Sequence, residues 1–165
     1  MLVRRSLRAA CADDSDARVD EMTRAFQRHY ARHCLDHTRV YPGLERVVHE
    51  MRCAGKRLAV LTNKPRTFSE QILSGLGLRD AFETVLGGDD LPTKKPDPAG
   101  LDWILDDVGC DVGQAVLVGD SDVDIETARN TGVAACAVTW GFRVPSKLSE
   151  ARFVARRPDD LLSIV

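Results

Sequence analysis

Short apolar runs alternate with amphipathic segments along most of this chain, and that alternation limits the possible folds more than any other feature. The apolar runs are too short for helices and are bounded by polar residues or glycine; they occupy residues 57–61, 84–86, 115–118 and 134–138. Between them, apolar positions recur at helical spacing in segments around 68–73, 101–108 and 122–131. Strands that alternate with helices predict an α/β fold, a Rossmann-like parallel sheet with helices on both faces. The run 57–61 is expected to be a strand buried on both faces.

Two helices are predicted before the first strand. Residues 16–37 carry apolar side chains at helical spacing, and after the break at Tyr41-Pro42-Gly43 the pattern resumes over residues 44–55. The three histidines His29, His33 and His37 would share one face of the first helix, as in a helical metal site. A solvated polar stripe is the favoured interpretation, because no carboxylate or cysteine is placed to complete a tetrahedral shell. At the other end of the chain, residues 153–154 predict a short strand and residues 158–165 a closing helix.

The composition argues against several classes of partner. Lys and Arg total 23 against 25 Asp and Glu, so the chain has no basic surplus that would favour nucleic acid or an anionic membrane. Its apolar runs are far shorter than the roughly 20 residues that span a bilayer, and no apolar stretch of a secretory signal follows its basic start. Five cysteines without a C-x-x-C pair fit a reducing compartment. We therefore expect a cytoplasmic protein with a small-molecule partner, as a monomer or a homodimer.

Acidic residues gather where the strand at 115–118 gives way to a helix, in the segment Gly119-Asp120-Ser121-Asp122-Val123-Asp124. Ligands of parallel sheets bind at the carboxyl ends of the strands, so these acids lie at the predicted binding edge. Carboxylates packed together repel one another unless a cation lies among them, and Mg²⁺ prefers such oxygen ligands. Asp120 and Asp124 are the candidate metal ligands. The alternative for Asp124 is a capping box with Ser121 at the helix start, and both roles can hold at once.

Two further strand ends carry residues suited to an anion. Thr62 offers a hydroxyl and Asn63 an amide, next to a helix start whose first N–H groups lack intrahelical partners; such an assembly favours phosphate. Lys95, followed by Pro96, supplies a point charge of the kind that stabilises a phosphoryl group in transfer. Each of the three motifs is a weak indication of function by itself. Their order along the chain is more specific, because each motif lies at the end of a βα unit.

In this order the three motifs resemble the haloacid dehalogenase superfamily, whose later motifs are a strand-end Thr or Ser, a Lys and an acidic Gly-Asp-x-x-x-Asp. The segments similar to the phosphoglycolate phosphatases in particular are Thr62-Asn63-Lys64-Pro65, Lys95-Pro96-Asp97-Pro98 and Val118-Gly119-Asp120-Ser121. The resemblance implies a Mg²⁺-dependent phosphatase that acts on a small phosphorylated metabolite such as 2-phosphoglycolate, through an aspartyl-phosphate intermediate. It implies Thr62 and Lys95 as catalytic residues, Thr62, Asn63 and Lys95 as substrate ligands, and Asp120 and Asp124 as metal ligands.

The family's first motif, a buried strand that runs into Asp-x-Asp-Gly-Thr and provides the nucleophile, is absent from the sequence. Asp14-Ser15-Asp16 follows a poor strand and precedes no Gly-Thr, so these acids are interpreted as the N-terminal cap of the long helix. The chain as given is expected to be truncated and inactive. The alternative is a non-catalytic relative that retains phosphate binding.

The missing motif also affects the expected architecture. Residues 1–40 would be the remnant of a helical cap, and residues 41–165 the α/β core without its first strand. In the family that strand lies centrally in the sheet. The strands at 57–61 and 115–118 must therefore either pair directly or leave backbone groups unpaired.

Overall fold

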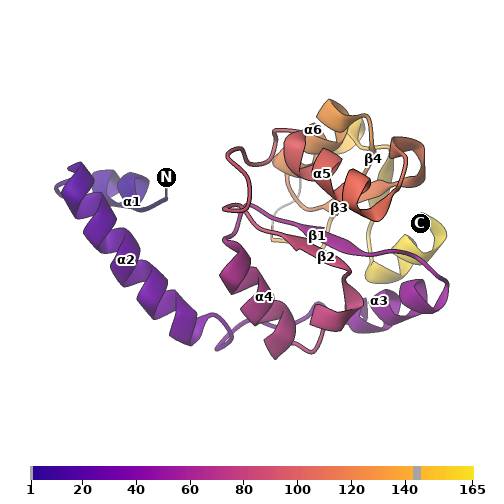
Figure 1. Ribbon diagram of the computed structural model, residues 1–165, viewed down its shortest axis with the longest axis horizontal. Helices are drawn as coiled ribbons and strands as arrows, with labels where there is room; N and C mark the ends of the chain where they lie inside the picture. Colours follow the sequence, from indigo (N-terminus) through magenta and orange to yellow (C-terminus); the bar gives the residue numbers. More distant parts are fainter. Residues whose placement is uncertain (1, 143–145) are drawn as a thin grey trace. The chain divides into compact units, whose positions relative to one another are not determined.

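The computed structural model describes residues 2–142 and 146–165, and the chain divides into two compact units, Met1–Thr38 and Arg39–Val165 (Figure 1). The first unit contains the helices α1 (Leu2–Ala9) and α2 (Asp16–His33). Helix α1 is not among the predicted elements. Ion pairs with Asp14 and Asp16, at the start of α2, hold it in place, and the sequence pattern gives no sign of them.

Those same acids do not cap α2, which corrects the predicted N-cap. The N-cap residue is Ser15, and its side chain makes no capping hydrogen bond to the helix. Asp14 instead accepts from Arg8 Nε at 2.5 Å, and Asp16 pairs with Arg4. The hydrogen bond from Arg8 lowers the pKa of Asp14. Pairing with α1 prevails over capping because hydrogen bonds between arginine and carboxylate are charge-assisted.

Helix α2 ends at His33, short of the predicted His37. The hydroxyl of Thr38 donates to the carbonyl of Cys34 at 2.5 Å, and the N–H of residue 38 would take that carbonyl if the helix continued. The three histidines therefore do not share one helical face. His29 and His33 remain neighbours, with ring centroids 4.3 Å apart.

The second unit alternates helices and strands in the predicted order. Its helices are α3 (Leu44–Cys53), α4 (Arg66–Gly75), α5 (Ala99–Val108) and α6 (Asp122–Thr131). Its strands are β1 (Ala59–Leu61), β2 (Thr84–Leu86), β3 (Val116–Gly119), β4 (Ala134–Val138) and β5 (Phe153–Ala155). A 3₁₀ helix, Pro158–Ser163, stands where the closing helix is predicted. Every strand pair among the described residues is parallel, which confirms the α/β class with parallel strands and helices.

The strands form two sheets, where one is predicted. β1 pairs with β2, and β3, β4 and β5 pair in that order. Within residues 2–142 and 146–165, no strand pairs with the second edge of β1 or of β3. The prediction that 57–61 is buried on both faces is therefore wrong: Ala59 is exposed, and Val60 and Leu61 are half-buried. On β3, Val118 is 38% exposed. A strand with an open edge lacks the neighbour that would cover its side chains.

Backbone hydrogen bonds show which side of β1 is open. The carbonyl of Leu58 accepts from the N–H of Glu83, and the N–H of Thr62 donates to the carbonyl of Leu86. Even-numbered residues of this segment thus direct their backbone groups toward β2, because alternate residues of a strand face the same neighbour. The backbone groups of Leu61 point to the opposite side.

On that open side lies the turn that joins β3 to α6. The Leu61 carbonyl accepts from Lys95 Nζ, which also donates to Asp124 in the first turn of α6. Leu61 of β1 and Leu117 of β3 both pack against one apolar cluster, formed by Leu101 and Leu105 of α5 together with Val133. β1 and β3 thus contribute side chains to the same cluster but do not pair directly. The prediction left two outcomes open, direct pairing of these strands or unpaired backbone groups, and the structure shows the second.

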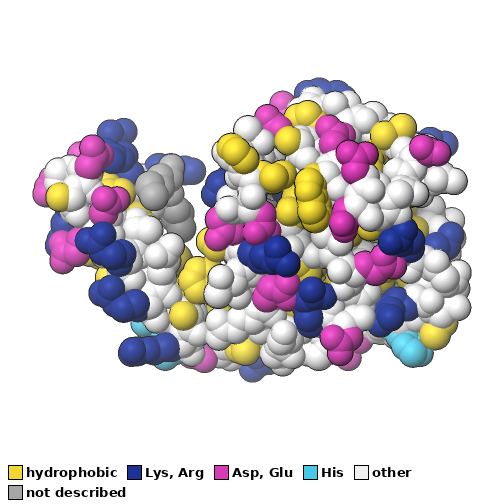
Figure 2. Space-filling model, in the orientation of Figure 1, with side chains coloured by type: hydrophobic (Ala, Val, Ile, Leu, Met, Phe, Trp, Pro, Cys, Tyr) yellow, Lys and Arg dark blue, Asp and Glu magenta, His cyan; other side chains and the backbone are white. Residues whose placement is uncertain are grey.

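Helices cover both faces of the larger sheet, as predicted. Cys136 and Val138 of β4 pack with α3, whereas Ala135 and Ala137, which point to the opposite face, pack with α6. Figure 2 shows Lys and Arg side chains interspersed with Asp and Glu on the face viewed. In the part of the chain that the structure describes, no helix combines the length and apolar character needed to cross a membrane.

Candidate active site

Lys95 joins the predicted motifs. It lies in the segment before α5, and its Nζ donates to the carbonyl of Leu61 at 2.9 Å and to Asp124 Oδ1 at 2.6 Å. The Lys95 side chain is 13% exposed and that of Asp124 10%, so the ion pair is largely shielded from solvent. A lysine ammonium has three N–H donors, and these two contacts leave one for a further oxygen. The charge is held between the end of β1, next to Thr62, and the first turn of α6, which follows Asp120.

The side chain of Asn63 makes two hydrogen bonds to the backbone of Lys95. Its Nδ2 donates to the Lys95 carbonyl at 3.0 Å, and its Oδ1 accepts from the Lys95 N–H at 2.9 Å. The backbone of Asn63 lies close to Gly88, where an added Cβ would be 2.3 Å from the Asn63 carbonyl oxygen. These contacts show that Asn63 positions Lys95. Its role as a substrate ligand stays a prediction.

Thr62 is half-buried at the carboxyl end of β1. Its Oγ1 accepts from the N–H of Lys64 at 3.1 Å, which leaves the hydroxyl proton available to donate. The neighbouring helix start is partly occupied, because the N–H of Arg66 donates to Asp89 Oδ1 at 2.7 Å. Asp89 is not among the predicted site residues, although Gly87-Gly88 before it indicate a turn at the end of a strand. A phosphate group at Thr62, as predicted, would therefore depend on the Thr62 hydroxyl more than on the Arg66 N–H.

Asp124 is buried, with 7% of its surface exposed, and both of its carboxylate oxygens are engaged. Oδ1 accepts from Lys95, and Oδ2 accepts from the Ser121 N–H at 3.1 Å and from the Ser121 hydroxyl at 2.5 Å. The capping box suggested by the sequence is therefore present. Metal ligation by Asp124 stays a prediction, and in this arrangement the carboxylate holds Lys95.

Asp120 follows β3 and contacts the loop after β4. Its Oδ2 accepts from the Phe142 N–H at 2.7 Å, and among the described residues no donor reaches Oδ1. Asp122 binds the same loop farther along, accepting from the Ser146 hydroxyl at 2.6 Å and from the Lys147 N–H at 2.9 Å. These hydrogen bonds, that from Ser146 foremost, lower the pKa of Asp122. Sequence reasoning missed both loop contacts, because they join residues 22 to 25 positions apart that no local pattern relates.

The oxygen ligands at this edge suit magnesium in kind. Mg²⁺ is commonly held by one or two carboxylates, with water and substrate phosphate in the rest of its shell. Asp120, with Oδ1 open, fits as one such ligand. Within the described ranges, no three side chains of His, Cys, Asp or Glu are grouped so as to hold a metal ion. Most of the shell would therefore come from phosphate and water.

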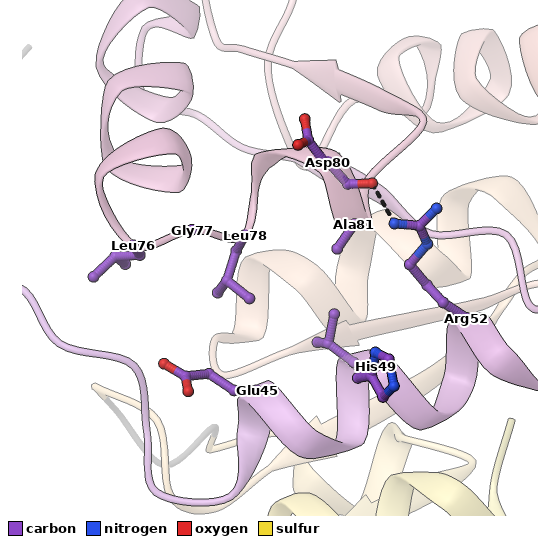
Figure 3. Close-up of a pocket in the computed structure, with 9 residues that line it drawn as sticks. Glu45, His49, Arg52, Leu76, Gly77, Leu78, Asp80 and Ala81 are labelled. Carbon is purple, nitrogen blue, oxygen red and sulfur yellow. Dashed lines mark hydrogen bonds between the residues drawn. The ribbon is translucent and has the colours of Figure 1, made fainter.

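A groove of about 340 Å³ lies elsewhere in the second unit, between α3 and the segment that follows α4 (Figure 3). Apolar side chains such as Leu78 share its lining with the charged or polar Glu45, His49 and Arg52. Arg52 Nη1 donates to the carbonyl of Asp80 at 2.5 Å across one end. None of the motif residues lines this groove. The strand-end contacts, and not this groove, therefore define the candidate active site.

Known proteins resemble this chain in sequence and in fold. Residues 5–138 match the family model for haloacid dehalogenase-like hydrolases. The phosphoglycolate phosphatase of Rhodospirillum rubrum is 41% identical over 132 residues, which cover 79% of this chain and 55% of that protein. The phosphoglycolate phosphatase of Vibrio parahaemolyticus is 34% identical over 172 aligned positions, which cover 100% of this chain and 75% of that protein. A crystal structure of a predicted phosphoglycolate phosphatase from Haemophilus somnus has a TM-score of 0.90 at 29% identity, and covers 98% of this chain and 73% of that one.

The chain thus spans little more than half the length of the Rhodospirillum relative. The matched family region includes β1, β2, β3 and β4 together with Thr62, Lys95 and Asp120. Because the family model covers most of the chain and relatives named as phosphatases match it at more than 30% identity, this chain belongs to the haloacid dehalogenase-like hydrolases and is related to their phosphatases.

Proposed function

We propose that this chain carries the phosphate- and magnesium-binding part of a phosphatase that hydrolyses small phosphate monoesters such as 2-phosphoglycolate. One observation supports the proposal most strongly: the shielded ammonium of Lys95 joins the last residue of β1, next to Thr62, to Asp124 in the first turn of α6, the helix that follows Asp120. The names of the relatives provide the substrate class. Residues 1–40 as part of a cap, residues 41–165 as a core without its first strand, and a cytoplasmic location remain parts of this proposal.

Each site residue would have a distinct task toward the phosphoryl group. The Thr62 hydroxyl would donate to one phosphoryl oxygen, and the remaining N–H of Lys95 to another, which offsets the negative charge that develops in transfer. Asp124 would keep the ammonium oriented, and Asn63 would fix the backbone that carries it. A magnesium ion at Asp120 would supply further charge stabilisation to the phosphoryl oxygens.

The aspartate nucleophile that the family resemblance implies has no candidate among these residues. The sequence contains no Asp-x-Asp-Gly-Thr, and the pair Asp14 and Asp16 belongs to the first unit, where both acids are bound to arginines. Loss of the attacking group of a covalent mechanism lowers the rate by orders of magnitude. We therefore propose that the chain alone is inactive. The same observation favours a second candidate, a non-catalytic relative that binds phosphate through Thr62 and Lys95.

Phosphate titration and a phosphatase assay test these proposals together. Inorganic phosphate, added with Mg²⁺ and followed by calorimetry, should bind the unaltered chain and bind more weakly to Thr62→Ala and Lys95→Gln. Lys94→Gln is the matched control, because Lys94 is the adjacent exposed lysine and should not affect binding. Release of phosphate from 2-phosphoglycolate should not exceed a buffer blank. Absence of phosphate binding would refute the proposed site.

The catalytic part has its own deciding outcomes. Turnover that survives repurification and disappears in Asp14→Ala or Asp16→Ala would show that one of those acids is the nucleophile. The two candidate functions separate when a strand peptide ending in Asp-x-Asp-Gly-Thr is added to the chain. Mg²⁺-dependent turnover would support the phosphatase, and saturable peptide binding without turnover would support the non-catalytic relative.

A further inference from the structure

The backbone after β4 lies directly against Asp120. The N–H of Phe142 donates to Asp120 Oδ2 at 2.7 Å. A Cβ built on Gly141 would lie 2.2 Å from Asp120 Cβ and 2.6 Å from Asp120 Oδ2. Both distances are far below van der Waals contact. This close approach is therefore open only to glycine, and any side chain at residue 141 must displace the loop or rotate the carboxylate.

We propose that Gly141 and the backbone N–H of Phe142 are positioning groups that orient Asp120 toward the metal ion, an inference that rests on the proposed function. The N–H group occupies Oδ2 and so leaves Oδ1 for the cation. Carboxylates that ligate metals are themselves held by outer hydrogen bonds, and loss of such a partner typically lowers metal affinity about 10–100-fold. Gly141 contributes by having no side chain.

The side chain of Phe142 has no part in this arrangement, since the residue is 87% exposed. The backbone donor and the side chain can therefore be separated by substitution. Phe142→Ala keeps the N–H, whereas Phe142→Pro removes it. Gly113 provides the matched glycine control, because a Cβ built there meets nothing within 4 Å and the residue precedes the same strand that Asp120 follows.

The experiment measures Mn²⁺ binding, as a probe for Mg²⁺, by electron paramagnetic resonance of the free ion in the presence of inorganic phosphate. Gly141→Ala and Phe142→Pro should each weaken Mn²⁺ binding about 10–100-fold. Phe142→Ala and Gly113→Ala should retain the affinity of the unaltered chain. Without metal, the Phe142 amide should be protected from hydrogen exchange, and Asp120→Ala and Gly141→Ala should remove that protection.

Three results would overturn the inference, and they differ in what they imply for the proposed function. Unchanged Mn²⁺ affinity in Gly141→Ala and Phe142→Pro would refute the positioning role alone. An equal loss in Phe142→Ala and Gly113→Ala would indicate general damage to the fold and would also refute it. No saturable Mn²⁺ binding by the unaltered chain would refute the metal site of the proposed function, and the positioning role with it.

Discussion

The open edges of β1 and β3 predict that an added strand stabilises this protein. On β1, Ala59 and Leu61 direct their backbone groups away from β2, and of these groups the Leu61 carbonyl accepts from Lys95. Among the residues that the structure describes, no strand pairs with this edge, so the N–H and C=O of Ala59 and the N–H of Leu61 are available to an added strand. At about 0.5–1.5 kcal/mol per net hydrogen bond, this edge alone offers roughly 2–4 kcal/mol. Pairing along β3 and cover for Val118 would add to that.

The perturbation is a synthetic peptide with a short apolar strand that ends in Asp-x-Asp-Gly-Thr. At about a hundredfold excess over its dissociation constant, a ligand stabilises the folded state by about 2.7 kcal/mol. For a chain of this size, each kcal/mol raises the melting temperature by about 2–4 °C. Scanning calorimetry should therefore show a rise of about 5–10 °C. Without the peptide, exposed strand edges favour aggregation, so we expect poor solubility or a broad transition.

Hydrogen exchange locates the effect. The amide of Leu61 should exchange fast in the chain alone and slowly with the peptide, because it faces the open edge. The amide of Val60 is the internal control, since it faces β2 and should be protected in both states. The control peptide carries proline at alternate positions and so lacks half of its N–H donors. A sharp two-state transition that the strand peptide leaves unchanged, with Leu61 already protected, would refute the reasoning about the open edges.

Three further substitutions test other contacts. Lys95→Met leaves the shielded carboxylate of Asp124 without its ion-pair partner and should cost about 3–5 kcal/mol, measured by urea unfolding; a loss below about 1 kcal/mol would contradict the shielded pair. The folded state lowers the pKa of Asp122, so the Asp122 carboxylate contributes fully to the stability of the fold above about pH 3.9, the ordinary pKa of an aspartate. That contribution is lost as the pH falls through the lowered pKa. Asp122→Asn should therefore flatten the acid limb of the stability–pH curve, and an unaltered limb would show that the loop bonds do not matter. Gly88→Ala forces a Cβ to within 2.3 Å of backbone and should cost about 1–3 kcal/mol in thermal unfolding, whereas Gly113→Ala should be neutral.

Sequence reasoning succeeded where local periodicity and packing determine the element. Helices α5 and α6 and strand β4 follow apolar patterns that correspond directly to their buried faces. The run 57–61 shows the limit of that logic. Its apolar residues report a preference for burial, but the presence of a neighbouring strand is a property of the whole sheet. Helix α1 escaped prediction for a related reason, because its ion pairs to Asp14 and Asp16 belong to tertiary structure.

The candidate active site, like the fold, could be predicted from the sequence only in part. The rule that ligands of parallel sheets bind at the carboxyl ends of strands predicts Thr62, Lys95 and Asp120 at one edge, and the structure joins Lys95 to the end of β1 and to the first turn of α6. The partners of each side chain were beyond that rule. Two examples are the hydrogen bond from the Asn63 side chain to the Lys95 backbone and the hydrogen bond from the Phe142 N–H to Asp120. Both depend on how loops from different βα units meet.

The division of the strands between two sheets also bears on how the chain becomes folded. One ladder closes within residues 59–86 and the other within residues 116–155, and each joins strands that follow one another in the chain. Closing loops between successive strands costs less entropy than pairing distant ones, so such contacts form early. We expect each ladder to nucleate by itself, with the docking of the two as the late step that brings Leu61 and Leu117 against the same apolar cluster.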